Sequence, residues 1–129
     1  MRRRVYIAGP ITRGDLCHNV NQATDAFVRL AKGGLAPLCP HWSVYSKPAR
    51  PAGENGVYCT GTANGNDQMS HEDWMGVDLP WVAVADAVLR LPGESSGADC
   101  EVAEANRCGV PVFNTVAAVL EWAAWNKAA

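Results

Sequence analysis

The chain has 129 residues, of which 48% are hydrophobic and 19% are charged, and its formal net charge is −2. This composition is typical of one globular domain with a sizeable core, and it excludes a fibre or a disordered chain. A near-neutral charge with no basic cluster beyond residues 2–4 argues against an extended nucleic-acid interface.

The lengths of the apolar runs and the pattern of cysteines indicate the cellular compartment in which the protein is expected. No apolar run approaches the roughly 20 residues that cross a bilayer, so no membrane is expected as a partner. The short apolar stretch Val5–Ile11 ends in a Gly-Pro pair and is typical of a buried strand, not of a signal peptide. Five cysteines without a C-x-x-C spacing favour free thiols in a reducing cytoplasm over a disulfide framework.

The N-terminal third predicts a strand, a helix and a second strand. The strand covers residues 5–8 and stops at Gly9-Pro10. A helical period of apolar residues then runs from Val20 to Ala31, with Asn19 as a candidate cap and Gly33-Gly34 as its end. The apolar residues 35–38 predict a second strand that ends before Pro40.

Residues 40–69 interrupt this alternation of strands and helices. They are rich in Gly, Pro, Asn and Ser and show no sustained period, so they predict a lid-like insertion within a single domain that spans residues 1–129. Its aromatic residues, Trp42, Tyr45 and Tyr58, favour an ordered lid. Ser70 with Asp73 matches a capping box and predicts a helix through Trp74 and Met75.

The C-terminal part predicts two further strand–helix pairs. Strands are expected at residues 88–91 and 110–113, and helices at 98–107, closed by Gly109, and at 115–126. On the last helix, Trp122 and Trp125 fall nearly opposite its apolar stripe. They predict a subunit contact in a homo-oligomer, with packing against the first strand or the lid as the alternative.

Alternating strands and helices predict an α/β fold with a parallel sheet of four to five strands and helices on both faces. Ligands of such sheets bind at the carboxyl ends of the strands. The loops 9–15 and 92–97 are therefore expected to meet at the site.

The segment Ser95–Glu101 is the most informative motif. Hydroxyls and a glycine open a helix whose free backbone N–H groups can hold an anion. The pattern places Glu101 in the first turn of that helix, where a carboxylate would face whatever carries the anion. Acidic residues also favour first turns because of the helix dipole, and Asp99 alone could serve that purpose.

Four motifs in this order resemble the nucleoside 2-deoxyribosyltransferase-like superfamily, which includes the transferases and the 2'-deoxynucleoside 5'-monophosphate N-hydrolases. They are Val5–Ile11, Asp78, Asp86–Val88 and the pattern from Ser95 through Gly97 and Glu101 to Ala105. The resemblance covers most of the chain apart from residues 40–69. It implies a flavodoxin-like fold and cleavage of an N-glycosidic bond.

The resemblance also implies roles for three residues. Glu101 matches the nucleophile that attacks the anomeric carbon, and Tyr6 matches a tyrosine that holds this nucleophile. Asp78 matches a carboxylate that contacts the base or sugar, although Asp78-Leu79-Pro80 is also a good helix start. Asp86 is interpreted as structural.

The residue six positions before the nucleophile distinguishes the subfamilies. The transferases tend to have an aspartate there and the monophosphate hydrolases a serine, because a carboxylate repels a 5'-phosphate. Ser95, together with Ser96, Gly97 and Arg13, therefore favours a nucleotide. The first loop departs from the hydrolase pattern, because Pro10 follows the glycine and removes one N–H donor.

The sequence thus predicts hydrolysis of a (deoxy)nucleoside 5'-monophosphate without a cofactor or metal. Glu101, Tyr6 and Asp78 are the candidate catalytic residues. The candidate substrate-binding residues are Gly9, Pro10, Ile11, Arg13, Trp42, Ser95, Ser96 and Gly97, with Trp42 as a candidate for stacking on the base. Base exchange, a non-catalytic nucleotide sensor, and cleavage of a nicotinamide or ADP-ribose compound are the alternatives.

Overall fold

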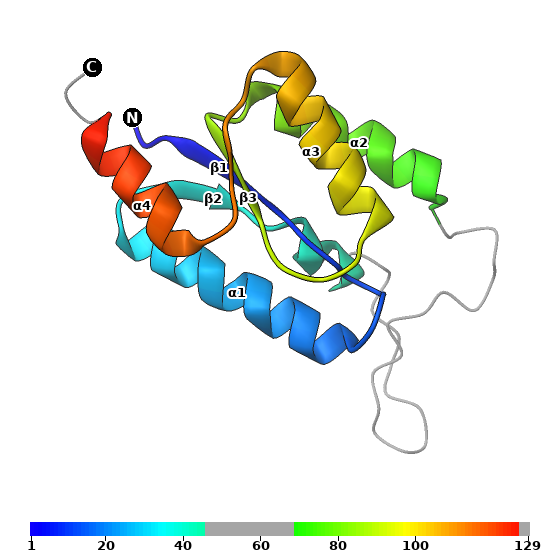
Figure 1. The fold of residues 1–129 in the computed structure, drawn as a ribbon. Helices are drawn as coiled ribbons and strands as arrows, with labels where there is room; N and C mark the ends of the chain where they lie inside the picture. Colours follow the sequence, from blue (N-terminus) through cyan, green and yellow to red (C-terminus); the bar gives the residue numbers. More distant parts are fainter. Residues whose placement is uncertain (46–68, 127–129) are drawn as a thin grey trace.

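A computed structural model describes residues 1–45 and 69–126. Its centre is a four-stranded parallel sheet with the order β2-β1-β3-β4 (Figure 1). The strands are β1 (Arg4–Ala8), β2 (Ala36–Leu38), β3 (Ala87–Arg90) and β4 (Val112–Phe113). The structure confirms the predicted α/β fold and its strand number. β1 and β3 pair in the middle, with Tyr6 opposite Val88 and Ala8 opposite Arg90.

Helices cover both faces of the sheet. Helices α1 (Leu16–Lys32) and α4 (Val116–Trp125) lie on one face, and α2 (His71–Val84) and α3 (Ser96–Cys108) on the other (Figure 1). Successive strand residues point to opposite faces, so Val5 and Ile7 pack in the α1/α4 core while Tyr6 and Ala8 pack in the α2/α3 core. This alternation decides which side chains of β1 and β3 can reach a site built on α2 and α3.

The start of α1 differs from the prediction. Asp15, not Asn19, is its N-cap, and the Asp15 side chain accepts a hydrogen bond from the His18 backbone N–H. Asn19 is buried inside the helix, and its side-chain amide donates to the carbonyls of Ile11 (3.0 Å) and Arg13 (2.8 Å). Asn19, which was predicted as the cap, therefore holds the loop after β1 against α1.

Helix α2 contradicts the interpretation of Asp78-Leu79-Pro80 as a helix start. The predicted capping box of Ser70 and Asp73 is present, and the helix continues without interruption past Asp78. Pro80 lies inside it. A proline removes the hydrogen bond to the carbonyl four residues earlier, and that residue, Gly76, lies on the exposed side where water can reach it.

Helix α4 packs closely on the rest of the domain. Trp122 lies 5.5 Å from Phe113 between ring centroids, and the Arg3 guanidinium lies 5.0 Å above its ring. Trp122 thus belongs to intramolecular packing near the first strand, which was the alternative to a subunit contact. Trp125 is 80% exposed, and its part in an oligomer stays a prediction.

The predicted lid lies largely outside the described residues, which include only its first six residues and its last. Pro40–Tyr45 form a short 3₁₀ helix, η1. None of the helices in the described part of the chain combines the length and apolar character that a membrane crossing requires.

Candidate active site

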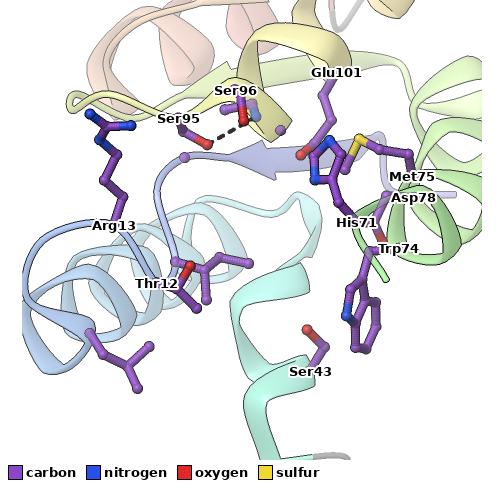
Figure 2. A pocket seen from close by; sticks show the side chains of 15 residues that line it. Thr12, Arg13, Ser43, His71, Trp74, Met75, Asp78, Ser95, Ser96 and Glu101 are labelled. Atoms are coloured by element: carbon purple, nitrogen blue, oxygen red, sulfur yellow. Dashed lines mark hydrogen bonds between the residues drawn. The ribbon is translucent and has the colours of Figure 1, made fainter. Parts of the chain in front are cut away.

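A cavity of about 320 Å³ opens over the carboxyl ends of β1 and β3 (Figure 2). The loop after β1, the N-terminal half of α2 and the start of α3 supply most of its wall. The lining residues are Gly9, Ile11, Thr12, Arg13, Leu16, Ser43, His71, Trp74, Met75, Asp78, Ser95, Ser96, Gly97, Ala98 and Glu101. The two loops therefore meet as predicted.

Two contacts hold these loops together. A Cβ added to Gly93 would lie 2.8 Å from Pro10 Cγ, so the turn after β3 sits directly against the first loop, and Gly93 has a φ of +113° that suits only glycine. Arg13 forms an ion pair of 2.9 Å with Glu94 across the same gap. Pro10 lines not this cavity but a neighbouring hollow that it shares with Arg13, so its place in the substrate site stays a prediction.

Glu101 lies deeper than the sequence suggested. Ser95 is the N-cap of α3, so Asp99 occupies the first turn and Glu101 the second. Glu101 shares a buried stripe with Ala98 and Ala105, and it is only 6% exposed. The correction strengthens its candidacy, because a carboxylate that merely served the helix dipole would lie in the exposed first turn.

Tyr6 and Asp78 complete a cluster with Glu101. Tyr6 is buried on β1, and its hydroxyl is close enough to both carboxyl groups for each of them to raise its pKa. Within the described residues, the Tyr6 hydroxyl and Glu101 Oε2 form no hydrogen bond of normal length and angle. Buried polar atoms without a hydrogen bond are uncommon in proteins and mark this cluster as unusual.

Burial raises the pKa of Glu101 to about 7. The Tyr6 hydroxyl opposes this shift, the negative charge of Asp78 adds to it, and the Arg90 guanidinium opposes it. Burial also raises the pKa of Asp78, again against the effect of Tyr6. Two neighbouring carboxyl groups of this kind titrate as a pair. Such a pair loses its two protons in separate steps, so one carboxyl group can be ionised while the other keeps its proton, as a nucleophile beside a proton donor requires.

This burial predicts a pH-dependent stability difference for Glu101→Gln. A carboxyl group whose pKa rises from 4.5 unfolded to about 7 folded stabilises the protein fully below pH 4.5 and progressively less as the pH rises towards about 7. The glutamine variant has no group that titrates at this position, so it does not lose stability in this way. Its free energy of unfolding relative to wild type should therefore increase between pH 4.5 and 8 by on the order of 3 kcal/mol. Urea unfolding across this range measures the difference, and a difference independent of pH would contradict it.

The start of α3 forms the polar end of the cavity. The Ser95 hydroxyl accepts a hydrogen bond from the Ala98 N–H at 3.0 Å. The first backbone N–H groups of a helix have no partner within the helix and can bind an anion. Ser96 and Gly97 line the cavity at this point, and Arg13 stands at its edge (Figure 2). The Arg13–Glu94 pair is mostly exposed and therefore weak, so it can be exchanged for a ligand.

The structure does not bring Trp42 into the cavity. Its ring packs on Phe27 with 4.5 Å between centroids, and its indole N–H donates to Thr24 Oγ1. Trp74 of α2 lines the cavity instead (Figure 2). The sequence contains a pattern that could have identified Trp74: it precedes Asp78 by four residues, so both side chains lie on one face of a helix. His71 precedes Trp74 by three residues and therefore lies on the same face, one further turn towards the N-terminus.

Other chemistry-bearing residues lie elsewhere. Asp86 has the structural role expected of it, since its carboxylate accepts a hydrogen bond from the Arg4 backbone N–H at 2.7 Å. Cys100 is exposed and does not line the cavity. Cys39, His41 and His71 are residues of metal-ligand type near the ends of the predicted lid, and a fourth such residue, Cys59, lies outside the described residues. Within residues 1–45 and 69–126, no group of three His, Cys, Asp or Glu side chains is arranged to hold a metal ion.

Comparison with solved structures supports the fold. The chain is similar to a 2-deoxyribosyltransferase from the psychrotolerant bacterium Bacillus psychrosaccharolyticus, with a TM-score of 0.54 and 18% sequence identity. The match covers 84% of this chain and 69% of that one. No protein-family model and no curated protein sequence matches the chain. The similarity thus shows that this chain shares the fold of that protein.

Proposed function

We propose that this protein cleaves the N-glycosidic bond of a (deoxy)nucleoside 5'-monophosphate and transfers the sugar phosphate to water. The observation that carries the proposal is the buried carboxyl group of Glu101, which lies in a cavity beside Tyr6 and Asp78 and one turn from an anion-binding helix start. The shared fold with a 2-deoxyribosyltransferase supports glycosidic chemistry at this place.

In the first step, a Glu101 oxygen attacks C1' of the sugar while the C1'–N bond breaks. The electron pair of that bond leaves with the base, and Asp78 donates the proton that neutralises it. The raised pKa of Asp78 favours its protonated form for this purpose. The Tyr6 hydroxyl, which lies near both groups, orients the Glu101 carboxylate.

In the second step, water attacks C1' and the bond to Glu101 breaks. Asp78, now ionised, accepts the proton from that water. Glu101 leaves as a carboxylate, and both carboxyl groups return to their starting states. The two steps yield a free base and a sugar 5'-phosphate.

The charges at the cavity favour a phosphorylated substrate. The helix start at residues 95–97 and the Arg13 guanidinium offer N–H donors and positive charge at one end. Trp74 of α2 supplies an aromatic wall on the side of the cavity away from Arg13 (Figure 2). A nucleotide with its phosphate at the start of α3 and its base against α2 places C1' between these ends, near Glu101.

Replacing Trp74 with alanine is expected to raise KM for the nucleotide about tenfold with a smaller change in kcat, because stacking of a base on an aromatic ring contributes about 1–3 kcal/mol. Trp81→Ala is the matched control. Trp81 lies on the same helix, is 56% exposed and does not line the cavity. Steady-state kinetics compare the two, and equal effects would remove Trp74 from the base-binding wall.

Base exchange is the second candidate, because the structural relative is a transferase. The two reactions share the first step and differ in whether water or a second base attacks C1'. Incubation with a deoxynucleotide and a foreign base decides between them, since only exchange produces a new nucleotide.

A panel of ribo- and deoxynucleoside monophosphates, with the matching nucleosides, tests the proposal. We expect free base from at least one monophosphate and at least about tenfold less from its nucleoside. If no compound releases base while Glu101→Gln still binds a nucleotide, the protein is a sensor and the enzymatic proposal is wrong.

A further inference from the structure

Arg90, the last residue of β3, is a largely buried cation outside the cavity wall. Its side chain is 16% exposed. One terminal nitrogen donates to the Leu91 carbonyl, and the other donates to the Gly93 carbonyl at 3.0 Å and to Asp99 Oδ1 at 3.1 Å. The guanidinium therefore joins the end of the strand, the following turn and the first turn of α3.

The register of the sheet places Arg90 beneath the candidate site. Arg90 pairs with Ala8 of β1, and its side chain shares the sheet face of Val88 and Tyr6, the face that α2 and α3 cover. Tyr6 is its diagonal neighbour across the two strands. The turn that Arg90 holds leads directly to Ser95, so the position of the anion-binding helix start depends on this turn.

The guanidinium of Arg90 has one anionic partner among the described residues, the carboxylate of Asp99 at 3.1 Å. Two of its partners are neutral carbonyls, and the third, Asp99, is 74% exposed so that water screens its charge. The ionisable or charged groups around Glu101 are Tyr6 of β1, His71 and Asp78 of α2, Arg90 of β3, and Asp99 on α3 itself. Among the groups that act on the Glu101 carboxyl, Arg90 alone is positively charged, and it lowers the pKa that burial and Asp78 raise.

We propose that Arg90 is a positioning residue of the candidate site, whose guanidinium fixes the start of α3 on the sheet and stabilises the ionised carboxylate of Glu101. This role deepens the proposed function. Only the contribution of Arg90 to catalysis rests on that function, whereas its effects on Glu101 and on the start of α3 do not. The electrostatic part and the positional part predict different results for different substitutions.

The test titrates Glu101 by NMR in protein labelled at glutamate side-chain carboxyl carbons, with Glu101→Gln used to assign its signal. Arg90→Gln keeps an N–H donor and removes the charge, so the pKa of Glu101 should rise by roughly half a unit or more. Arg90→Lys keeps the charge and loses the fork of donors, so the pKa should stay within about 0.2 unit. Amide hydrogen exchange at residues 91–99 should accelerate in both variants.

An unchanged Glu101 titration in Arg90→Gln, or the same rise in Arg90→Lys, overturns the electrostatic role. Unchanged amide exchange overturns the positional role. If Arg90→Gln does not fold, Arg90→Met replaces it. Methionine keeps an apolar stem in the same space and removes the charge, so the pKa of Glu101 should again rise, and an unchanged pKa overturns the electrostatic role.

The activity measurement separates this inference from the proposed function. If wild type releases base, the pH at which kcat/KM decreases on the acid side should shift in each variant by the same amount as the pKa of Glu101 measured by NMR. If wild type releases no base from any nucleotide, the proposed function fails while the titration still tests Arg90.

Discussion

Replacing Glu101 with glutamine is expected to reduce base release at least about a thousandfold, because the amide cannot form the bond to C1'. Single-turnover measurement of free base from the best monophosphate of the panel gives this value directly. Glutamine fills nearly the same space, and burial of a neutral group costs less than burial of a carboxylate. The loss should therefore occur in a folded protein that still binds the nucleotide.

Glu104→Gln is the matched control for this substitution. Glu104 lies on the same helix, and its carboxylate pairs with the mostly exposed Arg107. Glu104 does not line the cavity, so this variant should keep wild-type activity within about twofold. Retention of more than a tenth of the activity in Glu101→Gln would assign the nucleophile elsewhere.

The pH profile follows from the same carboxyl group. Only ionised Glu101 attacks C1', and its pKa in the free protein is about 7. The value of kcat/KM should therefore decrease as the pH falls through this value. A profile that is flat between pH 5 and 8 would contradict the assignment.

Replacing Asp78 with asparagine is expected to reduce base release about a hundredfold or more, because the leaving nitrogen then lacks its proton donor. A nucleotide of a 7-methylated purine carries a positively charged base that leaves without protonation. The deficit of Asp78→Asn should shrink to less than about tenfold with that substrate. Parallel kinetics with the methylated and unmethylated nucleotides make the comparison.

Glu72→Gln is the control for Asp78→Asn, since Glu72 is exposed in the first turn of the same helix and does not line the cavity. Removing the negative charge of Asp78 also removes one cause of the raised pKa of Glu101, so the acid limb should move to lower pH. An equal deficit with both nucleotides would show that Asp78 positions the substrate and donates no proton.

The sequence was sufficient to predict the sheet, because short apolar runs bounded by glycine and proline have few alternatives in an α/β pattern. It was also sufficient to predict that residues 9–15 and 92–97 meet. Tyr6 could be placed on the buried first strand, and the alternation along that strand determines which layer receives its hydroxyl.

Other features depended on tertiary contacts that local patterns do not contain. Asn19 has the residue type of a cap, but Asp15 lies at the helix start and leaves the Asn19 amide free to bind two loop carbonyls. The aromatic ring of Trp42 suggested that it stacks on the base. In the structure this ring packs on Phe27 and donates a hydrogen bond to Thr24, away from the cavity. The role of Trp74 was missed because a proline after Asp78 suggested a helix boundary there.

The weak pair of Arg13 and Glu94 has a consequence for substrate choice. Glu94 and an incoming anion would compete for the same guanidinium. A phosphate monoester is the stronger competitor as a dianion, above its second pKa of about 6, whereas a sugar hydroxyl carries no charge with which to compete. Because both side chains of the pair are mostly exposed, this competition lowers the affinity for a phosphate only slightly.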